Sequence, residues 1–232
     1  MKVAIMQPYL FPYIGYWQLV GAADAFVILD DVNFIRRGWI NRNRIMQNGS
    51  EVLFTLPVLS ASQNRLISET SFTGDTKAYA KLLKMFRQAY AKAPFAAEMN
   101  EIAAKCLNFE DKGVTALLKN QIETVADYLG IKKEILKASD LRPADHQRAQ
   151  EGILELCKIT GADVYINPIG GVSLYEKEAF AKEGIELYFL HTDFTEAEKL
   201  TGGRQADLSI IDLIANLPKE VLTELLGCYK FE

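Results

Sequence analysis

The feature that most constrains the fold is a strand–helix–strand pattern in the first thirty residues. Residues 2–6, KVAIM, form a short apolar run that ends at Gln7-Pro8, and residues 25–29, AFVIL, form a second run. Runs of this kind are typical of strands buried on both faces, and the proline marks an end. Residues 13–23 between them suit a helix. Two buried strands joined by a helix are expected to be parallel, which predicts an α/β fold.

Later segments extend this alternation. Apolar runs at 134–138, 164–167 and 185–190 predict further strands, and residues 51–58 predict another, with 64–72 as its partner. Predicted helices cover 76–91, 95–108, 113–129, 145–160, 207–216 and 218–227. The pattern favours a doubly wound, mostly parallel sheet of the HUP/Rossmann-like kind in a single α/β domain, residues 1–232. The consecutive helices within 76–129 predict a helical insert or lid.

Composition narrows the classes of protein to consider. No apolar run approaches the ~20 residues that span a bilayer, so we expect a cytoplasmic protein without a transmembrane segment. Three scattered cysteines and two histidines favour neither a disulfide framework nor a zinc site, whereas carboxylate-held magnesium stays open. The net charge is −4, yet residues 1–50 carry five Lys/Arg against three Asp. The acidic whole argues against nucleic-acid binding, and the local basic excess indicates a smaller anionic ligand.

Ligands of doubly wound sheets bind at the carboxyl ends of the strands. The end after Met6 carries five aromatic residues within nine positions, together with two prolines. An aromatic cluster that only packs the first helix onto the sheet is the alternative to a ligand site. The candidate substrate-binding residues are Gln7, Tyr9, Tyr13 and Tyr16.

Asp30 and Asp31 follow the second strand. One of them could cap the next turn, or bind a ribose, an ammonium group or magnesium. Adjacent strand-end side chains point apart, so we expect only one to face a site.

Four of the chain's nine arginines then fall within nine residues that contain no acid. A guanidinium group binds phosphate or carboxylate through two N–H groups, so this arginine cluster predicts an anion site, with a solvated surface as the alternative. Its members are Arg36, Arg37, Asn41, Arg42 and Arg44.

The two later strand ends add Asn167 with Gly170 and Gly171, and then His191. The glycine pair could form an anion-binding nest of backbone N–H groups, or a plain turn. His191 could act as a base, or only form hydrogen bonds. Because parallel strands end at one edge of the sheet, we predict that these strand ends form one pocket. The residues expected to converge there are Gln7, Tyr16, Asp30, Arg37 and Asn167.

Four segments resemble the WbqC-like family of bacterial proteins. They are MQPYLFPYIGYWQL (6–19), DDVNFIRRGWINRNRI (30–45), YINPIGG (165–171) and LSIIDLI (208–214), and together they span nearly the whole chain. This resemblance implies a role tied to surface-polysaccharide or O-antigen clusters, where amino sugars are built and decorated.

The first strand–helix–strand unit also resembles, more weakly, nucleotidylyltransferases and pantothenate synthetase. Those proteins carry an HxGH-like helix start, where this chain reads Tyr13-Ile14-Gly15-Tyr16. The glycine spacing is retained and both histidine positions are tyrosine.

These resemblances imply an enzyme that modifies a nucleotide-linked amino sugar by acyl or aminoacyl transfer to the sugar amine. The arginines would hold phosphate or an acyl carboxylate, and Asp30, Asp31 and His191 are the catalytic candidates. ATP with magnesium is the candidate cofactor, through an acyl-adenylate. A non-catalytic module that binds a nucleotide sugar or a partner protein is the alternative. The sequence leaves the sugar, the acyl donor and the oligomeric state open.

Overall fold

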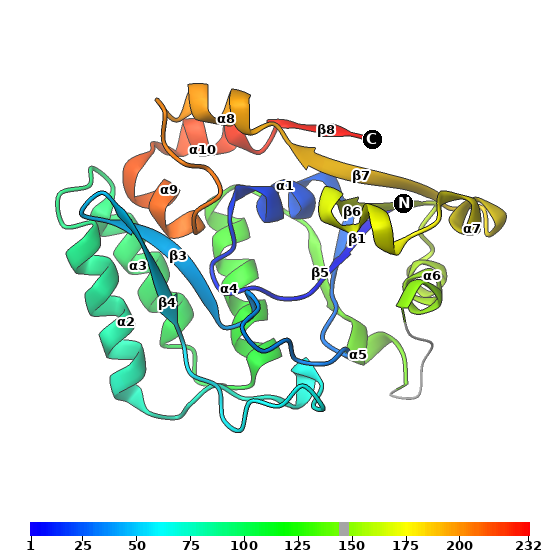
Figure 1. Cartoon of the computed structure of the whole chain (residues 1–232), viewed down its shortest axis with the longest axis horizontal. Coiled ribbons are helices and arrows are strands. Elements are labelled where there is room, and N and C mark those ends of the chain that lie inside the picture. Colours follow the sequence, from blue (N-terminus) through cyan, green and yellow to red (C-terminus); the bar gives the residue numbers. More distant parts are fainter. Residues whose placement is uncertain (144–148) are drawn as a thin grey trace.

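A computed structural model describes residues 1–143 and 149–232 of the chain. Within these residues, one six-stranded sheet has the order β5–β2–β1–β6–β7–β8 (Figure 1). The first five strands of this order are parallel and β8 is antiparallel, which confirms the predicted mostly parallel, doubly wound fold. The strands are β1 (Lys2–Met6), β2 (Ala25–Ile28), β5 (Glu134–Lys137), β6 (Val164–Pro168), β7 (Glu186–Thr192) and β8 (Tyr229–Phe231).

The order of the strands places a switch point between β1 and β6. The chain starts at β1, moves outward to β2 and β5, and then crosses to β6 and β7 on the other side of β1. Ala4 in β1 pairs with Phe26 in β2 and with Ile166 in β6. In sheets of this kind, the crevice beyond the carboxyl ends of the strands at the switch point is where ligands bind.

Side chains alternate between two covered faces of the sheet, as buried parallel strands require. Ala4, Phe26 and Ile166 belong to the core that includes α1 (Ile14–Ala22), α4 (Val114–Tyr128) and α9 (Ile210–Asn216). Val3 and Tyr165 belong to a second core with α6 (Ala149–Thr160) and α7 (Lys177–Lys182). Figure 1 shows these two groups of helices on opposite sides of the sheet.

The helices predicted within 76–129 are present as α2 (Thr76–Ala89), α3 (Ala96–Leu107) and α4. They follow a two-stranded hairpin of β3 (Arg42–Gln47) and β4 (Ser50–Thr55), which forms a separate sheet. The sequence analysis predicted β4 but missed β3, because Arg42, Asn43 and Arg44 open this strand and it has no apolar run. Residues 64–72 do not form a strand beside β4; beyond the end of β4, Val58 forms an isolated bridge with Phe72, and the Leu59 N–H donates to the Ser71 carbonyl at 2.8 Å.

Short elements complete the part of the chain that the structure describes. They are η1 (Ile67–Glu69), α5 (Ala138–Leu141), η2 (Ile169–Leu174), α8 (Phe194–Leu200) and α10 (Lys219–Leu225). The predicted helix over 145–160 is α6, and its first predicted turn lies outside the described residues. Among the described residues, no helix has the length and apolar character that crossing a bilayer requires.

Candidate functional site

The turn between β1 and α1 is held in place by amides from two distant elements. The Asn43 side-chain amide at the start of β3 donates to the carbonyls of Leu10 (3.1 Å) and Phe11 (2.8 Å). Gln121 of α4 accepts from the Phe11 N–H at 2.8 Å and donates to the Tyr9 carbonyl at 3.1 Å. These bonds satisfy backbone groups that a buried turn would otherwise leave unpaired. The turn therefore has a fixed position at the carboxyl edge of the sheet.

The start of α1 lies against the end of β7. A Cβ atom at Gly15 would lie 2.5 Å from the Thr192 hydroxyl and 2.5 Å from the Tyr13 ring, so only glycine allows this approach. The space over Gly15 is thus filled by the chain's own atoms. In the HxGH-like helix start that the sequence resembles, both histidine positions are tyrosine here, and the Tyr13 ring lies over Gly15.

A cavity of about 270 Å³ opens beside this turn, and we call it the aromatic cavity. The Tyr13 and Phe194 rings stack with their centroids 6.3 Å apart, and Trp39 is 40% exposed. Aromatic faces combined with a few polar groups are typical of pockets for small organic ligands. The lining residues are Tyr9, Pro12, Tyr13, Trp39, Asn43, Arg44, Phe194 and Asp207.

One arginine and one carboxylate supply the charge in the aromatic cavity. The Arg44 guanidinium lies 5.6 Å from the Trp39 ring centroid and donates to Asp207 at 3.0 Å and to Glu51 at 2.7 Å. Its buried Nε has no hydrogen-bond partner among the residues that the structure describes. Arg44 thus joins the hairpin to the segment before α9, and its side chain forms part of the cavity wall.

Burial raises the pKa of two tyrosines in this region above its ordinary value, so both hydroxyls carry their proton at neutral and at moderately alkaline pH. Desolvation raises the pKa of Tyr9 to about 12, with a smaller contribution from nearby Tyr13. Desolvation also raises the pKa of Tyr13, and the Thr192 hydroxyl opposes this shift. Tyr9 and Tyr13 can therefore act as hydrogen-bond donors to a ligand in the cavity.

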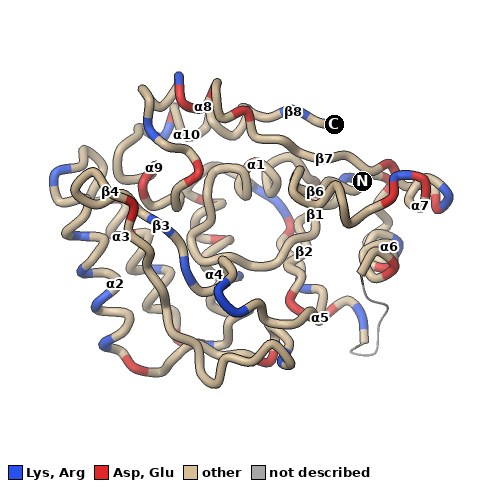
Figure 2. Tube along the Cα trace, in the orientation of Figure 1, with Lys and Arg blue, Asp and Glu red and all other residues tan. Residues whose placement is uncertain are grey.

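The arginine cluster does not act as one uncompensated patch, although Figure 2 shows basic positions in and before β3. The sequence analysis treated its charge as unpaired because residues 36–44 contain no acid, but folding brings Glu51 and Asp207 to Arg44. Arg42 donates to the carbonyls of Gly38 and Arg37 and braces their loop.

Three other members of the cluster have different positions. Arg36 and Arg37 are exposed and line none of the cavities described here. Asn41 is buried, and its side chain donates to the Leu56 carbonyl at 3.0 Å, which joins the start of the hairpin to its end.

Asp30 lies in a second cavity of about 600 Å³, at the carboxyl ends of β2 and β5. Its fully buried carboxylate accepts from the Ser139 N–H at 2.9 Å and from the Ser139 hydroxyl at 2.8 Å. Burial raises the pKa of Asp30, and the bonds from Ser139 oppose that shift. The other lining residues are mostly polar: Ser68, Phe109, Asp111, Gly113, Thr115, Ala116, Lys119, Asn120, Glu123, Lys137 and Ser139.

Asp31 points away from Asp30, as adjacent strand-end residues were expected to do, and forms a buried ion pair. Its two carboxylate oxygens accept from Arg142 Nε at 2.6 Å and Nη2 at 3.2 Å. The Asp31 and Arg142 residues are 3% and 7% exposed. This geometry gives Asp31 a structural role.

The remaining strand-end candidates lie apart from both cavities. Asn167 accepts from the Tyr165 hydroxyl at 3.2 Å, and its amide nitrogen occupies the space beside Gly171, where a Cβ would lie 1.8 Å away. Gly170 is exposed. His191 is half-exposed, with its Nδ1 3.7 Å from Glu232.

The structure does not bring the five residues expected to converge into one cavity. Tyr16 is buried in the core beside Phe26 and donates to the Gln7 carbonyl at 3.1 Å. Asn167 lies on the opposite face of the sheet, next to Tyr165. The carboxyl ends of the parallel strands do lie at one edge of the sheet, but the side chains at these ends point to different faces of the sheet. Of the predicted site residues, Tyr9, Tyr13 and Arg44 share the aromatic cavity.

The sequence analysis did not select Trp39, Phe194 and Asp207, which also line this cavity. Trp39 had a visible signal, since it interrupts a run of arginines, and Phe194 follows a strand end. Asp207 had no signal of its own, because only its contact with Arg44 places it at the site.

These features define the chain as a doubly wound α/β protein with an aromatic, partly charged cavity at the carboxyl edge of its sheet. Residues 7–224 match the WbqC-like protein family, and the chain belongs to this family. The chain is similar to the uncharacterized protein Rv1507c of Mycobacterium tuberculosis, with 28% identity over 229 residues and 98% of each chain covered. No solved structure matches the chain.

Proposed function

We propose that the protein modifies a nucleotide-linked amino sugar in surface-polysaccharide biosynthesis, by transferring an acyl or aminoacyl group to the sugar amine. The observation that carries this proposal is the aromatic cavity, in which Tyr13, Trp39 and Phe194 surround the paired Arg44 and Asp207. Aromatic faces stack on nucleobases and contact sugar rings, while a guanidinium binds phosphate. The sugar context comes from the resemblance of the sequence to the WbqC-like family.

The groups of the cavity suit the transfer step. The amine nitrogen would form a bond to the acyl carbonyl carbon as the bond to the donor's leaving group breaks, and the amine proton would pass to the Asp207 carboxylate. Tyr9 lines the same cavity, and its protonated hydroxyl can donate a hydrogen bond to the developing oxyanion. Of the catalytic candidates from the sequence, Asp30 stays available as a polar contact in its own cavity.

An activated acyl donor fits this proposal better than activation by ATP on the protein. Both histidine positions of the HxGH-like helix start are tyrosine here, and the Tyr13 ring lies over Gly15. The proposed transfer therefore starts from a donor that is already activated.

The test is a mass-spectrometric assay of the purified full chain with nucleoside-diphosphate-linked amino sugars and a set of acyl donors, combined with calorimetric titration of each sugar. We expect a mass increase of one acyl group on a sugar. Trp39→Ala should weaken sugar binding about tenfold or more, since stacking contributes about 1–3 kcal/mol. Tyr188→Ala is the matched control: it removes a similarly exposed aromatic side chain from β7, outside the aromatic cavity, and should leave sugar binding unchanged.

Sugar binding that depends on Trp39, without turnover for any donor, would instead support the non-catalytic binding module. Tyr13 and Tyr16 stand where the HxGH-like helix start has its two histidines, and their presence favours that alternative. Absence of binding for every nucleotide sugar would overturn both.

A further inference from the structure

Cavities continue along one face of β3 beyond the aromatic cavity. Residues two apart on a strand point to the same side, so Arg44 and Met46 share a face, and Asn48 follows in the turn. Arg44 lines the aromatic cavity, and Met46 lines a cavity of about 300 Å³. Met46 and Asn48 line a further cavity of about 280 Å³, beside the connection between α2 and α3. We call the last two the inner cavity and the outer cavity.

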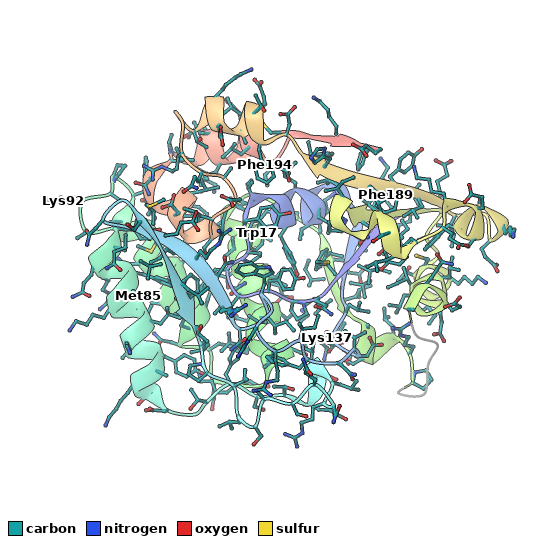
Figure 3. The ribbon with its side chains drawn as sticks, in the orientation of Figure 1. Trp17, Met85, Lys92, Lys137, Phe189 and Phe194 are labelled. Atoms are coloured by element: carbon teal, nitrogen blue, oxygen red, sulfur yellow. The ribbon has the colours of Figure 1, made fainter. Side chains whose placement is uncertain are left out.

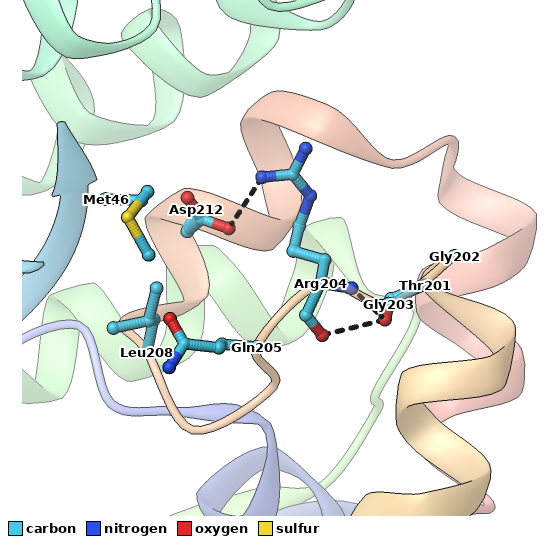
Figure 4. A pocket seen from close by; sticks show the side chains of 8 residues that line it. All are labelled: Met46, Thr201, Gly202, Gly203, Arg204, Gln205, Leu208 and Asp212. Carbon is cyan, nitrogen blue, oxygen red and sulfur yellow. Dashed lines mark hydrogen bonds and ion pairs between the residues drawn. The ribbon is translucent and has the colours of Figure 1, made fainter. Parts of the chain in front are cut away.

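Arg204 forms part of the wall of both the inner and the outer cavity. It is presented by a tight turn in which Gly202 and Gly203 have φ values of +66° and +86°, a conformation that favours glycine. The Thr201 hydroxyl accepts from the Arg204 N–H at 3.1 Å and donates to the Arg204 carbonyl at 2.8 Å (Figure 4). The glycine turn and the Thr201 hydroxyl therefore hold the backbone of Arg204 in place.

A buried carboxylate orients the Arg204 guanidinium. Asp212 is fully buried and accepts from the Tyr90 hydroxyl at 2.9 Å and from Arg204 Nη1 at 3.4 Å. Figure 4 shows the guanidinium reaching from its turn to Asp212. Burial raises the pKa of Asp212, while Tyr90 and Arg204 oppose that shift and favour its ionised form.

Most donors of this guanidinium stay available. Within residues 1–143 and 149–232, the bond to Asp212 is the one side-chain hydrogen bond of Arg204, out of five N–H groups. The Arg204 side chain is 35% exposed and lines both cavities. A guanidinium held at one end by a buried carboxylate can bind phosphate with its free edge.

A second cation completes the outer cavity. Lys92 is exposed and lies in the connection between α2 and α3, where Figure 3 labels it. The charged residues that line the outer cavity are Lys92, Arg204 and Asp212, a balance of +1. Asn48 and Asn216 add side-chain amides to the lining. The lining thus combines two cationic side chains with neutral amide groups. Such a set of hydrogen-bond donors suits an anion with several oxygen atoms.

The outer cavity is separated from the aromatic cavity by the segment before α9. Asp207 binds Arg44, and Gln205 donates to Glu51 at 3.2 Å, so this segment crosses the hairpin between the two cavities. The Ser209 N–H also donates to the Arg44 carbonyl at 3.0 Å. A ligand in the outer cavity therefore has a site of its own.

We propose that Arg204 and Lys92 form a second ligand site, which binds the phosphate or diphosphate group of a phosphate ester. The site is distinct from the aromatic cavity and does not depend on the function proposed for that cavity.

The test is calorimetric titration of the full chain with inorganic pyrophosphate, together with melting temperatures of all variants. We expect saturable binding that Arg204→Gln weakens at least tenfold and Lys92→Ala about three- to tenfold. Lys182→Ala on α7, on the other face of the sheet, is the matched control and should leave the affinity unchanged. Arg204→Gln also removes a charged partner of the buried Asp212, so a second variant is needed. Arg204→Lys keeps the positive charge and removes only the planar guanidinium with its paired N–H groups.

Unchanged pyrophosphate affinity in both Arg204→Gln and Lys92→Ala, or no binding to the unmodified chain, would overturn the proposal. Trp39 lines the aromatic cavity and neither of the other two, so a loss of pyrophosphate affinity in Trp39→Ala as large as in Arg204→Gln would overturn the claim of a separate site, whereas an unchanged affinity supports it. If pyrophosphate binds through Arg204 and no nucleotide sugar binds through Trp39, the function proposed for the aromatic cavity fails and this site stands.

Discussion

Asp30 and Asp31 are neighbours in the sequence, yet the fold gives them different surroundings. Asp30 faces a polar cavity and accepts hydrogen bonds from Ser139, while Asp31 is sealed in an ion pair with Arg142. The reason is the alternation of side chains at a strand end, which directs adjacent residues to opposite sides. Asp30 therefore contributes to the wall of a cavity, and Asp31 stabilises the connection between β2 and the segment after β5.

The ion pair leads to a prediction about stability. Asp31→Ala should lower the free energy of unfolding by about 3 kcal/mol, the low end for a broken buried ion pair, because it removes the two-point partner of Arg142 and leaves the longer contact with Glu155 at 3.5 Å. Asp140→Ala is the control: Asp140 pairs with Lys137 at an exposed position and should cost less than about 1 kcal/mol. Denaturant titration of both variants gives the comparison, and equal losses would contradict a special role for the buried pair.

At the scale of elements, the turn between β6 and η2 depends on one of its two glycines. A Cβ at Gly171 would lie 1.8 Å from the Asn167 amide nitrogen, whereas a Cβ at Gly170 would have no atom within 4 Å. The two glycines, which the sequence analysis treated as a pair, therefore have different surroundings. Gly171 permits a close packing contact, and Gly170 lies at the exposed surface.

This difference can be measured with a matched pair of variants. Gly171→Ala should lower the free energy of unfolding by about 1–3 kcal/mol, because the new methyl group must displace Asn167 from its bond with Tyr165. Gly170→Ala should stay within about 0.5 kcal/mol of the unmodified protein. Thermal and denaturant unfolding report both values, and a larger loss for Gly170→Ala would show that the turn is built differently.

For the whole molecule, the order of the strands predicts where local unfolding is most difficult. β1 has a hydrogen-bonded neighbour on each side and helices on both faces, while β8 is a short edge strand with exposed residues. We expect amides of β1 and β6 to exchange with deuterium only through global unfolding, and amides of β8 to exchange through local opening. Hydrogen-exchange mass spectrometry tests this order, and protection of β8 equal to that of β1 would contradict it.

The fold class followed from patterns that act locally. The buried runs at 2–6 and 25–29 are fully apolar over a strand length, and a helix between them leaves a parallel pairing as the expected geometry. The hairpin strand β3 was missed because Arg42 and Arg44 occupy its outward face, so local composition indicated a binding cluster. Their true partners are the carbonyls of the 37–38 loop and the acids Glu51 and Asp207, and proximity in sequence does not reveal such a set.

The sequence by itself determined the alternation of strands and helices, the carboxyl edge as the place of polar residues, and the family. Only the tertiary structure decided which of those residues share a cavity. Tyr9 and Tyr13 face Arg44 because the turn after β1 is bound to Asn43 and Gln121, which lie far along the chain. The physical reason is that a strand end fixes a position on the sheet edge, whereas the direction of a side chain and its charge partners depend on packing between distant segments.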